Sequence, residues 1–221
     1  ILLVERPGRL KIIDRSGQFS PPVAGLPQIY AGGPQGLVGA IAAREFATNH
    51  TVYLAYTAAD PKAPSPAPRL AGVLTVARAT LSADSSRLEG VQVLLNAEGI
   101  GGRMIQARDG TLLISSSIPA GVGIDSVDWP QPQQFDSLMG KVLRINTDGS
   151  APKDNPFVGR GGARPEIYGL GIPDHQGMAI HPRTGTLWVS EHGPRGGDEI
   201  NAIEKGKDYG YPTIGYGHEY T

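Results

Sequence analysis

The sequence lacks several features that would place it in a familiar class. None of its 221 residues is a cysteine, which excludes disulfide bonds, thiolate zinc sites and cysteine nucleophiles. Its longest apolar stretch covers about eight residues near 37–43, whereas a membrane helix needs roughly 20, so no membrane span is expected. The net charge is only −1, which argues against a nucleic-acid or acidic-membrane partner, because such binders carry a basic surface.

The N-terminal segment also lacks the pattern of a secretion signal. No basic region followed by a long apolar run and a small-residue cleavage site occurs in residues 1–9. We therefore expect either that a leader has been removed or that none existed.

Turn-forming residues are abundant instead. The chain has 31 glycines and 19 prolines without a collagen-like period, which indicates many turns and short strands. No segment longer than ten residues shows a helical period, although 133–140 has room for one helical turn. The pattern predicts strands near 1–5, 9–14, 37–43, 52–57, 70–81, 91–95, 103–107, 111–115, 141–146, 166–170, 177–180 and 186–190.

One sequence unit occurs three times. Each copy has a glycine, a short strand, a turn, a threonine and an apolar strand, and the copies begin at Gly36, Gly102 and Gly177. Repeated short strands joined by turns are typical of the blades of a β-propeller. The repeat therefore predicts an all-β propeller, while a β-sandwich with similar hairpins stays open on this pattern alone.

The length limits how much of a propeller the chain can form. Propellers close with roughly four to eight blades, and three repeats plus flanking strands make only about three to four. An open fan of blades leaves sheet edges exposed. We therefore expect residues 1–221 to be a single partial propeller domain, completed by missing C-terminal blades or by a second chain.

The densest group of acidic residues lies in a loop rich in glycine and proline. Glu191, Asp198 and Glu199 fall within residues 190–201. Calcium needs six to eight oxygen ligands from carboxylates and backbone carbonyls, which such a loop supplies. The segment predicts a calcium site, although solvated turn residues would give the same pattern.

Histidine and tyrosine provide further candidates. The five histidines show no zinc-protease spacing, and His175 and His192, both beside carboxylates in glycine-rich loops, are the best candidates for moving a proton. Four tyrosines fall between 209 and 220, where their rings could stack on a planar ligand. Structural roles remain the alternative for both groups. Residues 115–117 are serines without a nucleophile-elbow motif, so a serine hydrolase is not expected.

Several longer motifs give the chain a family resemblance. They are residues 5–9, 140–149, 154–157, 191–201 and 208–212. Together these motifs resemble the soluble aldose sugar dehydrogenases that use pyrroloquinoline quinone (PQQ), the glucose/sorbosone dehydrogenase family. The resemblance covers nearly the whole chain and implies a six-bladed β-propeller, of which this chain would provide about two thirds.

The resemblance also implies a reaction. In the family a quinone lies at one end of the central channel, held by calcium and by polar side chains. A histidine takes the proton of the sugar C1 hydroxyl while hydride passes to the quinone, and the product is a lactone. An aldose substrate, a separate electron acceptor and a periplasmic or secreted location are therefore expected.

Some site positions match those of the family. Gly193 and Pro194 fall where backbone carbonyls face the cofactor calcium, and Glu199 and Tyr209 fall where a second, structural calcium binds. Tyr220 falls where a tyrosine meets the cofactor. These five residues are the site positions that the resemblance carries over unchanged.

Three other positions depart from the family pattern. The cofactor-binding glutamine is replaced by Pro34, with Gln35 one residue later. An Arg-Asn pair is replaced by Pro173 and Asp174, and the catalytic histidine is replaced by Gly99. Gln35 and Asp174 remain the candidates for binding the cofactor.

These departures leave competing interpretations. In the first, the protein is a dehydrogenase in which Glu98 or His175 replaces the lost base. In the second, it is an inactive or truncated propeller that binds calcium and a ligand or partner. A lactonase-type hydrolytic propeller would need inward carboxylates, and Asp125, Asp128 and Asp174 are too loosely spaced to favour it.

Overall fold

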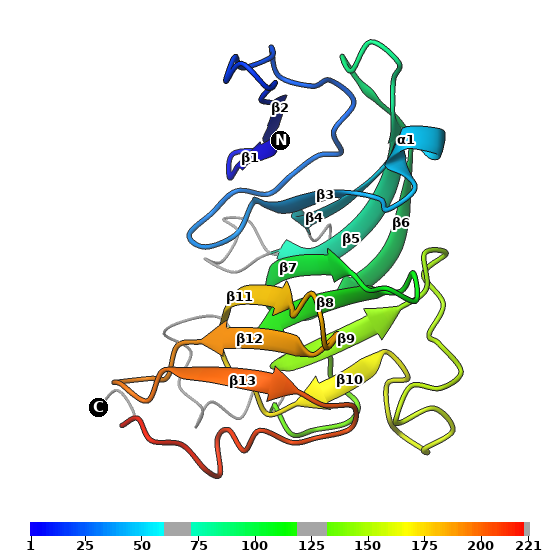
Figure 1. Cartoon of the computed structure of the whole chain (residues 1–221). Coiled ribbons are helices and arrows are strands. Elements are labelled where there is room, and N and C mark those ends of the chain that lie inside the picture. Colours follow the sequence, from blue (N-terminus) through cyan, green and yellow to red (C-terminus); the bar gives the residue numbers. More distant parts are fainter. Residues whose placement is uncertain (60–71, 119–131, 219–221) are drawn as a thin grey trace. The chain divides into compact units, whose positions relative to one another are not determined.

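The computed structural model describes residues 1–59, 72–118 and 132–218, and nearly every regular element within them is a strand (Figure 1). The helix α1 (Phe46–Asn49) has only four residues. Within the described ranges, no helix is long and apolar enough to cross a membrane. The chain divides into two compact units, Ile1–Asn96 and Ala97–Thr221, and each is described by itself.

The first unit begins with a hairpin and continues as a four-stranded sheet. The hairpin consists of β1 (Leu2–Glu5) and β2 (Arg9–Ile12). The antiparallel sheet follows the chain order β3 (Leu37–Ala42), β4 (Thr51–Ala59), β5 (Gly72–Leu81) and β6 (Leu88–Ala97). Hairpin and sheet share one apolar core, which includes Leu10, Leu37, Val52, Leu54, Tyr56, Ala77 and Leu88.

The second unit contains two sheets. The first has four antiparallel strands in the order β10-β9-β8-β7, with bounds β7 (Ile100–Gln106), β8 (Leu112–Ser117), β9 (Lys141–Ile145) and β10 (Ile167–Leu170). The second has three antiparallel strands, β11 (His175–Ile180), β12 (Leu187–Glu191) and β13 (Glu199–Ile203). A shared apolar core joins them, formed by Leu113, Val142, Ile172, Leu187, Val189 and Ile203.

Polar contacts tie these two sheets together at both strand ends. At one end the ring of His175 lies 3.2 Å from the hydroxyl of Ser117. At the other end the Arg108 guanidinium donates to the carbonyl of Pro182. We call the first the His175 end and the second the hairpin end, because the β7–β8 and β11–β12 turns lie there.

The three predicted repeats are confirmed as structural units. Each forms the first hairpin of a sheet, namely β3–β4, β7–β8 and β11–β12. The register of each hairpin shifts once near the leading glycine of its repeat, between Leu37 and Gly39, between Gly101 and Met104, and between His175 and Gly177.

Other predictions meet mixed outcomes. Most predicted strands are present with ends moved by a few residues, but α1 and β13 were not predicted, and β13 occupies part of the predicted metal loop. The helical turn at 133–140 is wrong, because these residues form turns and bends. Predicted loops and strand ends within 60–71 and 119–131 lie outside the described residues. The single-domain organisation of residues 1–221 stays a prediction.

Candidate functional site

Three strand ends and a neighbouring serine meet at the His175 end of the second unit. The antiparallel register places His175 on β11 opposite Glu191 on β12, and Glu191 opposite Glu199 on β13. Directly opposed residues share one face of a sheet, so these three titratable side chains form a row. Ser117, the last residue of β8, reaches this row from the other sheet.

The imidazole of His175 is almost completely buried, with 4% of the residue exposed. The backbone N–H of His175 donates to the Ser117 hydroxyl at 3.0 Å, and its Nδ1 lies 3.2 Å from the same oxygen. Its Nε2 is buried and has no hydrogen-bond partner among the described residues. Burial lowers the pKa of His175 to about 3, so the ring is neutral at physiological pH. A ligand oxygen could satisfy this nitrogen.

Glu191 is buried beside a second carboxylate. The Asn201 amide donates to Glu191 Oε1 at 2.6 Å and to Glu199 Oε2 at 3.1 Å. Burial, and then the charge of Glu199, raise the pKa of Glu191 to about 8, so the carboxyl is largely protonated at neutral pH. Its Oε2 has no partner within the described part of the chain.

Gly99 occupies the position where the resemblance implies a catalytic histidine, and it has no room for a side chain. Its φ is +97°, and a Cβ there would lie 2.5 Å from the Ser117 carbonyl oxygen and 2.9 Å from the Ser116 hydroxyl. A real Cβ does not approach a backbone atom this closely. The backbone around this position therefore accommodates glycine, and a histidine would fit only if the backbone moved.

The two acidic candidates have partners of their own. Glu98 Oε2 accepts the N–H of Leu138 at 3.0 Å, so this carboxylate holds a backbone segment in place. Asp174 accepts from the Gln176 amide at 2.8 Å, and burial raises its pKa, partly offset by His192 and by the Gln176 bond. Of the predicted catalytic pair Glu98 and His175, only the histidine is both buried and left with an unoccupied polar atom.

The predicted cofactor-calcium residues lie in the loop between β12 and β13. Asp198 closes this loop, because its Oδ1 accepts the N–H of Gly193 at 3.1 Å and its Oδ2 lies 3.4 Å from His192 Nδ1. No hydrogen bond within the described ranges ends on the carbonyl oxygen of Gly193 or Pro194. Two such oxygens are suitable calcium ligands.

The other predicted metal pair is separated along β13. Glu199 lies at the His175 end, whereas the Tyr209 hydroxyl donates to the Ala202 carbonyl at 2.6 Å and accepts the Glu204 N–H at 2.7 Å. The tyrosine hydroxyl is therefore already engaged. The part of the chain that the structure describes contains no group of three or more His, Asp or Glu side chains that could hold a metal ion.

The remaining cofactor candidates, Gln35 and Tyr220, are not among the described residues of the His175 end. Gln35 lies in the first unit, where it is 1% exposed and its amide donates to the Gly72 carbonyl at 3.4 Å. Its Oε1 has no partner among the residues described. Tyr220 lies outside the described residues. The assignment of Gln35, Asp174 and Tyr220 to cofactor binding stays a prediction.

Sequence reasoning missed two residues at the His175 end. Ser117 was set aside because its serine run lacks a hydrolase motif, and no sequence pattern could pair it with His175. Lys141 is fully buried, and its Nζ donates to the carbonyls of Pro132 at 2.6 Å and Met139 at 2.8 Å. Burial lowers the pKa of Lys141 to about 8. A lysine at the head of a strand whose next two residues are apolar was the available signal.

Several solved structures with this arrangement of strands are sugar dehydrogenases. The soluble aldose sugar dehydrogenase of Escherichia coli, in its apo form, matches with a TM-score of 0.87 and 32% identity over 99% of this chain and 61% of that chain. A PQQ-bound aldose sugar dehydrogenase from Streptomyces coelicolor matches with a TM-score of 0.77 and 25% identity over 96% of this chain and 59% of that chain. The fold of these neighbours is a β-propeller, so the predicted fold class is confirmed.

Sequence comparison identifies the family. The sequence model of the Glucose / Sorbosone dehydrogenase family matches residues 1–221. The aldose sugar dehydrogenase YliI of Escherichia coli (strain K12) is 34% identical over 230 residues, which cover 100% of this chain and 58% of that protein. The chain therefore belongs to the glucose/sorbosone dehydrogenase family, and it spans 58% of the length of this relative.

Proposed function

We propose that this protein oxidises aldose sugars at the C1 hydroxyl to a lactone, with PQQ as hydride acceptor and calcium in the same site. Family membership along the whole chain and a PQQ-bound structural neighbour support the proposal. The observation in this chain that carries it is the β12–β13 loop, where the carbonyls of Gly193 and Pro194 have no partner among the described residues.

The residues of this chain fit calcium better than they fit the quinone. The carbonyls of Gly193 and Pro194, which have no partner among the described residues, suit the cofactor calcium, and the Glu199 carboxylate suits the second, structural calcium, because calcium prefers hard oxygen ligands. Pro173 provides no cation for a quinone carboxylate, and Gly99 neither carries a base nor has room for one. No step of the reaction is assigned to either residue.

His175 is the residue to which we assign contact with the substrate oxygen. When bound, the quinone supplies hydride acceptance. The Ser117 hydroxyl contacts Nδ1 and so fixes the imidazole ring. Nε2, which has no partner among the described residues, could then accept a hydrogen bond from a substrate hydroxyl or take up the proton of that hydroxyl. Because burial disfavours the imidazolium ion, proton uptake here requires a nearby negative charge.

The test is reconstitution of the protein with PQQ and calcium, followed by glucose and a dye acceptor. We expect a bound-cofactor absorbance spectrum and dye reduction that His175→Ala abolishes. His181→Ala, in the β11–β12 turn, serves as the control that retains activity, and Glu98→Gln tests the other predicted base. Absence of a cofactor spectrum contradicts PQQ binding, and full activity in His175→Ala contradicts the role of the histidine.

Calcium binding is tested separately by thermal unfolding. A ligand that binds only the folded state raises the melting temperature. We expect calcium to raise it in the unaltered protein and in Glu204→Ala, which removes a carboxylate just after β13 at the hairpin end. Glu199→Ala should lose most of that rise. An equal rise in both variants would exclude Glu199 as a ligand.

A second candidate function is a calcium-bound propeller that binds a ligand or partner without turnover. The specific observation in its favour is Gly99, whose surroundings exclude the side chain of a base. A calcium-dependent rise in melting temperature without any cofactor spectrum would select this alternative.

The location of the protein and its partners are also proposals. We place it in the periplasm or outside the cell, with an electron acceptor as a partner, and with further blades or a second chain completing the ring. Fractionation of the native host with an antibody to this chain tests the location, and a purely cytoplasmic signal would contradict it.

A further inference from the structure

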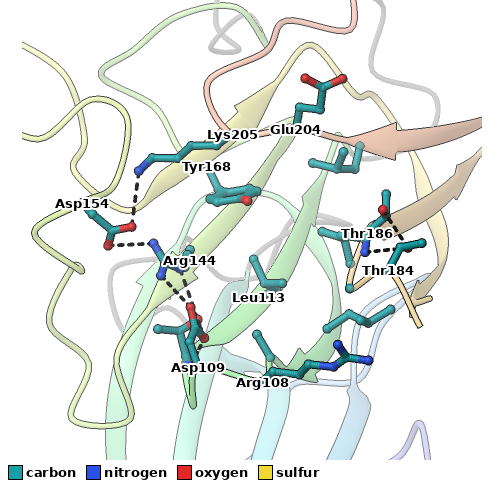
Figure 2. Close-up of a pocket in the computed structure, with 16 residues that line it drawn as sticks. Arg108, Asp109, Leu113, Arg144, Asp154, Tyr168, Thr184, Thr186, Glu204 and Lys205 are labelled. Carbon is teal, nitrogen blue, oxygen red and sulfur yellow. Dashed lines mark hydrogen bonds and ion pairs between the residues drawn. The ribbon is translucent and has the colours of Figure 1, made fainter. Parts of the chain in front are cut away.

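A cavity of about 730 Å³ opens at the hairpin end of the second unit, away from the proposed cofactor site. Figure 2 shows its walls, which come from the β7–β8 turn, the β11–β12 turn and the residues that follow β13. Its volume lies within the range of small-molecule sites. None of the residues assigned above to calcium or cofactor binding lines it.

The floor of the cavity is apolar. Leu113, Leu187 and Ile203 are each less than a tenth exposed, and their side chains belong to the core that joins the two sheets. Ile180 extends this floor toward the β11–β12 turn. A ligand with one apolar face therefore gains contact here without disturbing a polar group.

One wall consists of charges held in fixed positions. The Arg144 guanidinium bonds Asp109 at 2.7 Å, Asp154 at 2.9 Å and the Thr111 hydroxyl at 3.2 Å, and only 11% of its side chain is exposed. Lys205 bonds Asp154 from the rim at 3.3 Å, as Figure 2 shows. The arginine orients both carboxylates while their remaining lone pairs stay open to a donor.

The opposite wall carries hydroxyl groups. Thr184 and Thr186 lie 3.0 Å apart through their hydroxyl oxygens on the β11–β12 turn. A side-chain carbon at Gly185, between them, would meet only an Arg108 nitrogen at 3.9 Å. This side therefore offers donors and acceptors next to open space.

The charges that line the cavity balance. The cations are Arg108, Arg144 and Lys205, and the anions are Asp109, Asp154 and Glu204. A cavity with no excess positive charge does not favour a phosphate or a polycarboxylate such as the quinone. The lining instead suits a neutral molecule with many hydroxyls and one apolar face.

We propose that this cavity binds a neutral carbohydrate, with the C–H face of a pyranose ring on Leu113 and Ile180 and its hydroxyls bonded to Asp109, Asp154 and Thr186. The site is separate from the proposed reaction centre and requires neither PQQ nor calcium. A free monosaccharide and the end of an oligosaccharide present the same chemistry to it.

The test is isothermal titration of the protein in EDTA, without PQQ, using glucose, maltotriose, gluconate and glucose 6-phosphate. We expect millimolar binding of the neutral sugars and at least tenfold weaker binding of the two anions. Tighter binding of maltotriose than of glucose assigns the site to oligosaccharide ends, and equal binding assigns it to monosaccharides. Because the proposed reaction centre is stripped in EDTA, failure here leaves the dehydrogenase proposal intact.

Two variants locate the binding. Thr186→Val keeps the shape of the side chain, removes the hydroxyl and should weaken glucose binding at least fivefold. Thr80→Val, at an exposed position of β5 in the first unit, should leave it unchanged. Asp154→Asn replaces one carboxylate oxygen with an amide donor and leaves one excess positive charge, so it should weaken glucose binding and strengthen gluconate binding. Absence of sugar binding at 100 mM, stronger binding of the anions to the unaltered protein, or equal binding in all variants overturns the proposal.

Discussion

The two ends of the second unit are built from the same strands but differ in how completely their buried polar groups are paired. At the hairpin end the guanidinium of Arg144, whose side chain is 11% exposed, is bonded to two carboxylates. At the His175 end, His175 Nε2 and Glu191 Oε2 are buried without a partner among the described residues. An unpaired buried polar group costs on the order of 1–3 kcal/mol. The hairpin end has one such atom, Oε2 of Glu166, whose backbone carbonyl accepts the N–H of Arg144. The His175 end, with two, therefore gives up more stability than the hairpin end, as expected where a ligand binds.

Two glycines show the same contrast in the backbone. Gly99 and Gly110 both have positive φ, at +97° and +89°. A side chain at Gly99 would collide with the Ser117 carbonyl, whereas one at Gly110 would meet nothing within 4 Å. The backbone is closely confined at the His175 end and open to solvent at the tip of the β7–β8 turn.

The largest effect is expected from Gly99→Ala. Combined left-handed strain and collision with the backbone should lower the free energy of unfolding by about 2–4 kcal/mol. Gly110→Ala is the matched control and should cost only about 1 kcal/mol, because the left-handed backbone conformation is strained there but the new side chain would collide with nothing. Urea denaturation of both variants measures the difference. Equal losses would show that the Ser117 contact is unimportant.

The next effect is a pH dependence that originates in His175. Its folded pKa of about 3 lies below the ordinary 6.5, so below pH 6.5 the unfolded chain binds a proton that the folded chain refuses. Stability is therefore present above pH 6.5 and falls as the pH drops toward 3. The histidine alone should lose about 2 kcal/mol between pH 6 and pH 4. Urea unfolding at each pH measures this loss in the Glu191→Gln variant, where the opposing carboxyl is absent.

Glu191, which faces His175 across the strands, acts with the opposite sign. Its raised pKa makes stability fall as the pH rises from 4.5 toward 8. The two slopes oppose each other between pH 4.5 and 6, so the histidine slope should emerge in Glu191→Gln and vanish when His175→Gln is added. Ser117→Ala in the Glu191→Gln background keeps the imidazole and should keep the slope. A flat profile in Glu191→Gln would contradict the neutral, buried histidine.

A smaller effect is expected from Arg144→Leu at the hairpin end. Leucine retains much of the apolar contact but leaves Asp109 and Asp154 without their shared cation. Both carboxylates are more than half exposed, so water replaces part of the lost interaction. We expect a loss of about 1–2 kcal/mol by thermal or urea unfolding. A loss as large as that of Gly99→Ala would contradict the expectation that the His175 end is the more sensitive of the two to substitution.

The smallest effect is expected from Lys205→Ala. Its ion pair with Asp154 joins side chains that are 42% and 64% exposed, and exposed pairs contribute less than about 1 kcal/mol. The change in melting temperature should therefore be near the limit of detection in 1 M salt. A clear loss at high salt would show that the lysine packs against the cavity rim rather than acting through its charge.

The sequence predicted the framework far better than the site. Repeats at Gly36, Gly102 and Gly177 are local patterns, and each became the first hairpin of a sheet. The bond between Ser117 and His175 joins residues 58 positions apart, so no local pattern contains it. The confinement of Gly99 likewise depends on the carbonyl of a strand that follows it. β13 was missed because its acidic and polar residues looked like a loop.

The register shifts in the first hairpins have a consequence for insertions and deletions. In a strand, side chains alternate between faces, so a displacement of one position exchanges inside for outside. Loss or gain of a single residue within β3, β7 or β11 would therefore turn every side chain between that point and the following turn to the opposite face of the sheet. Homologous chains should vary in length between these hairpins and keep a constant residue count within them.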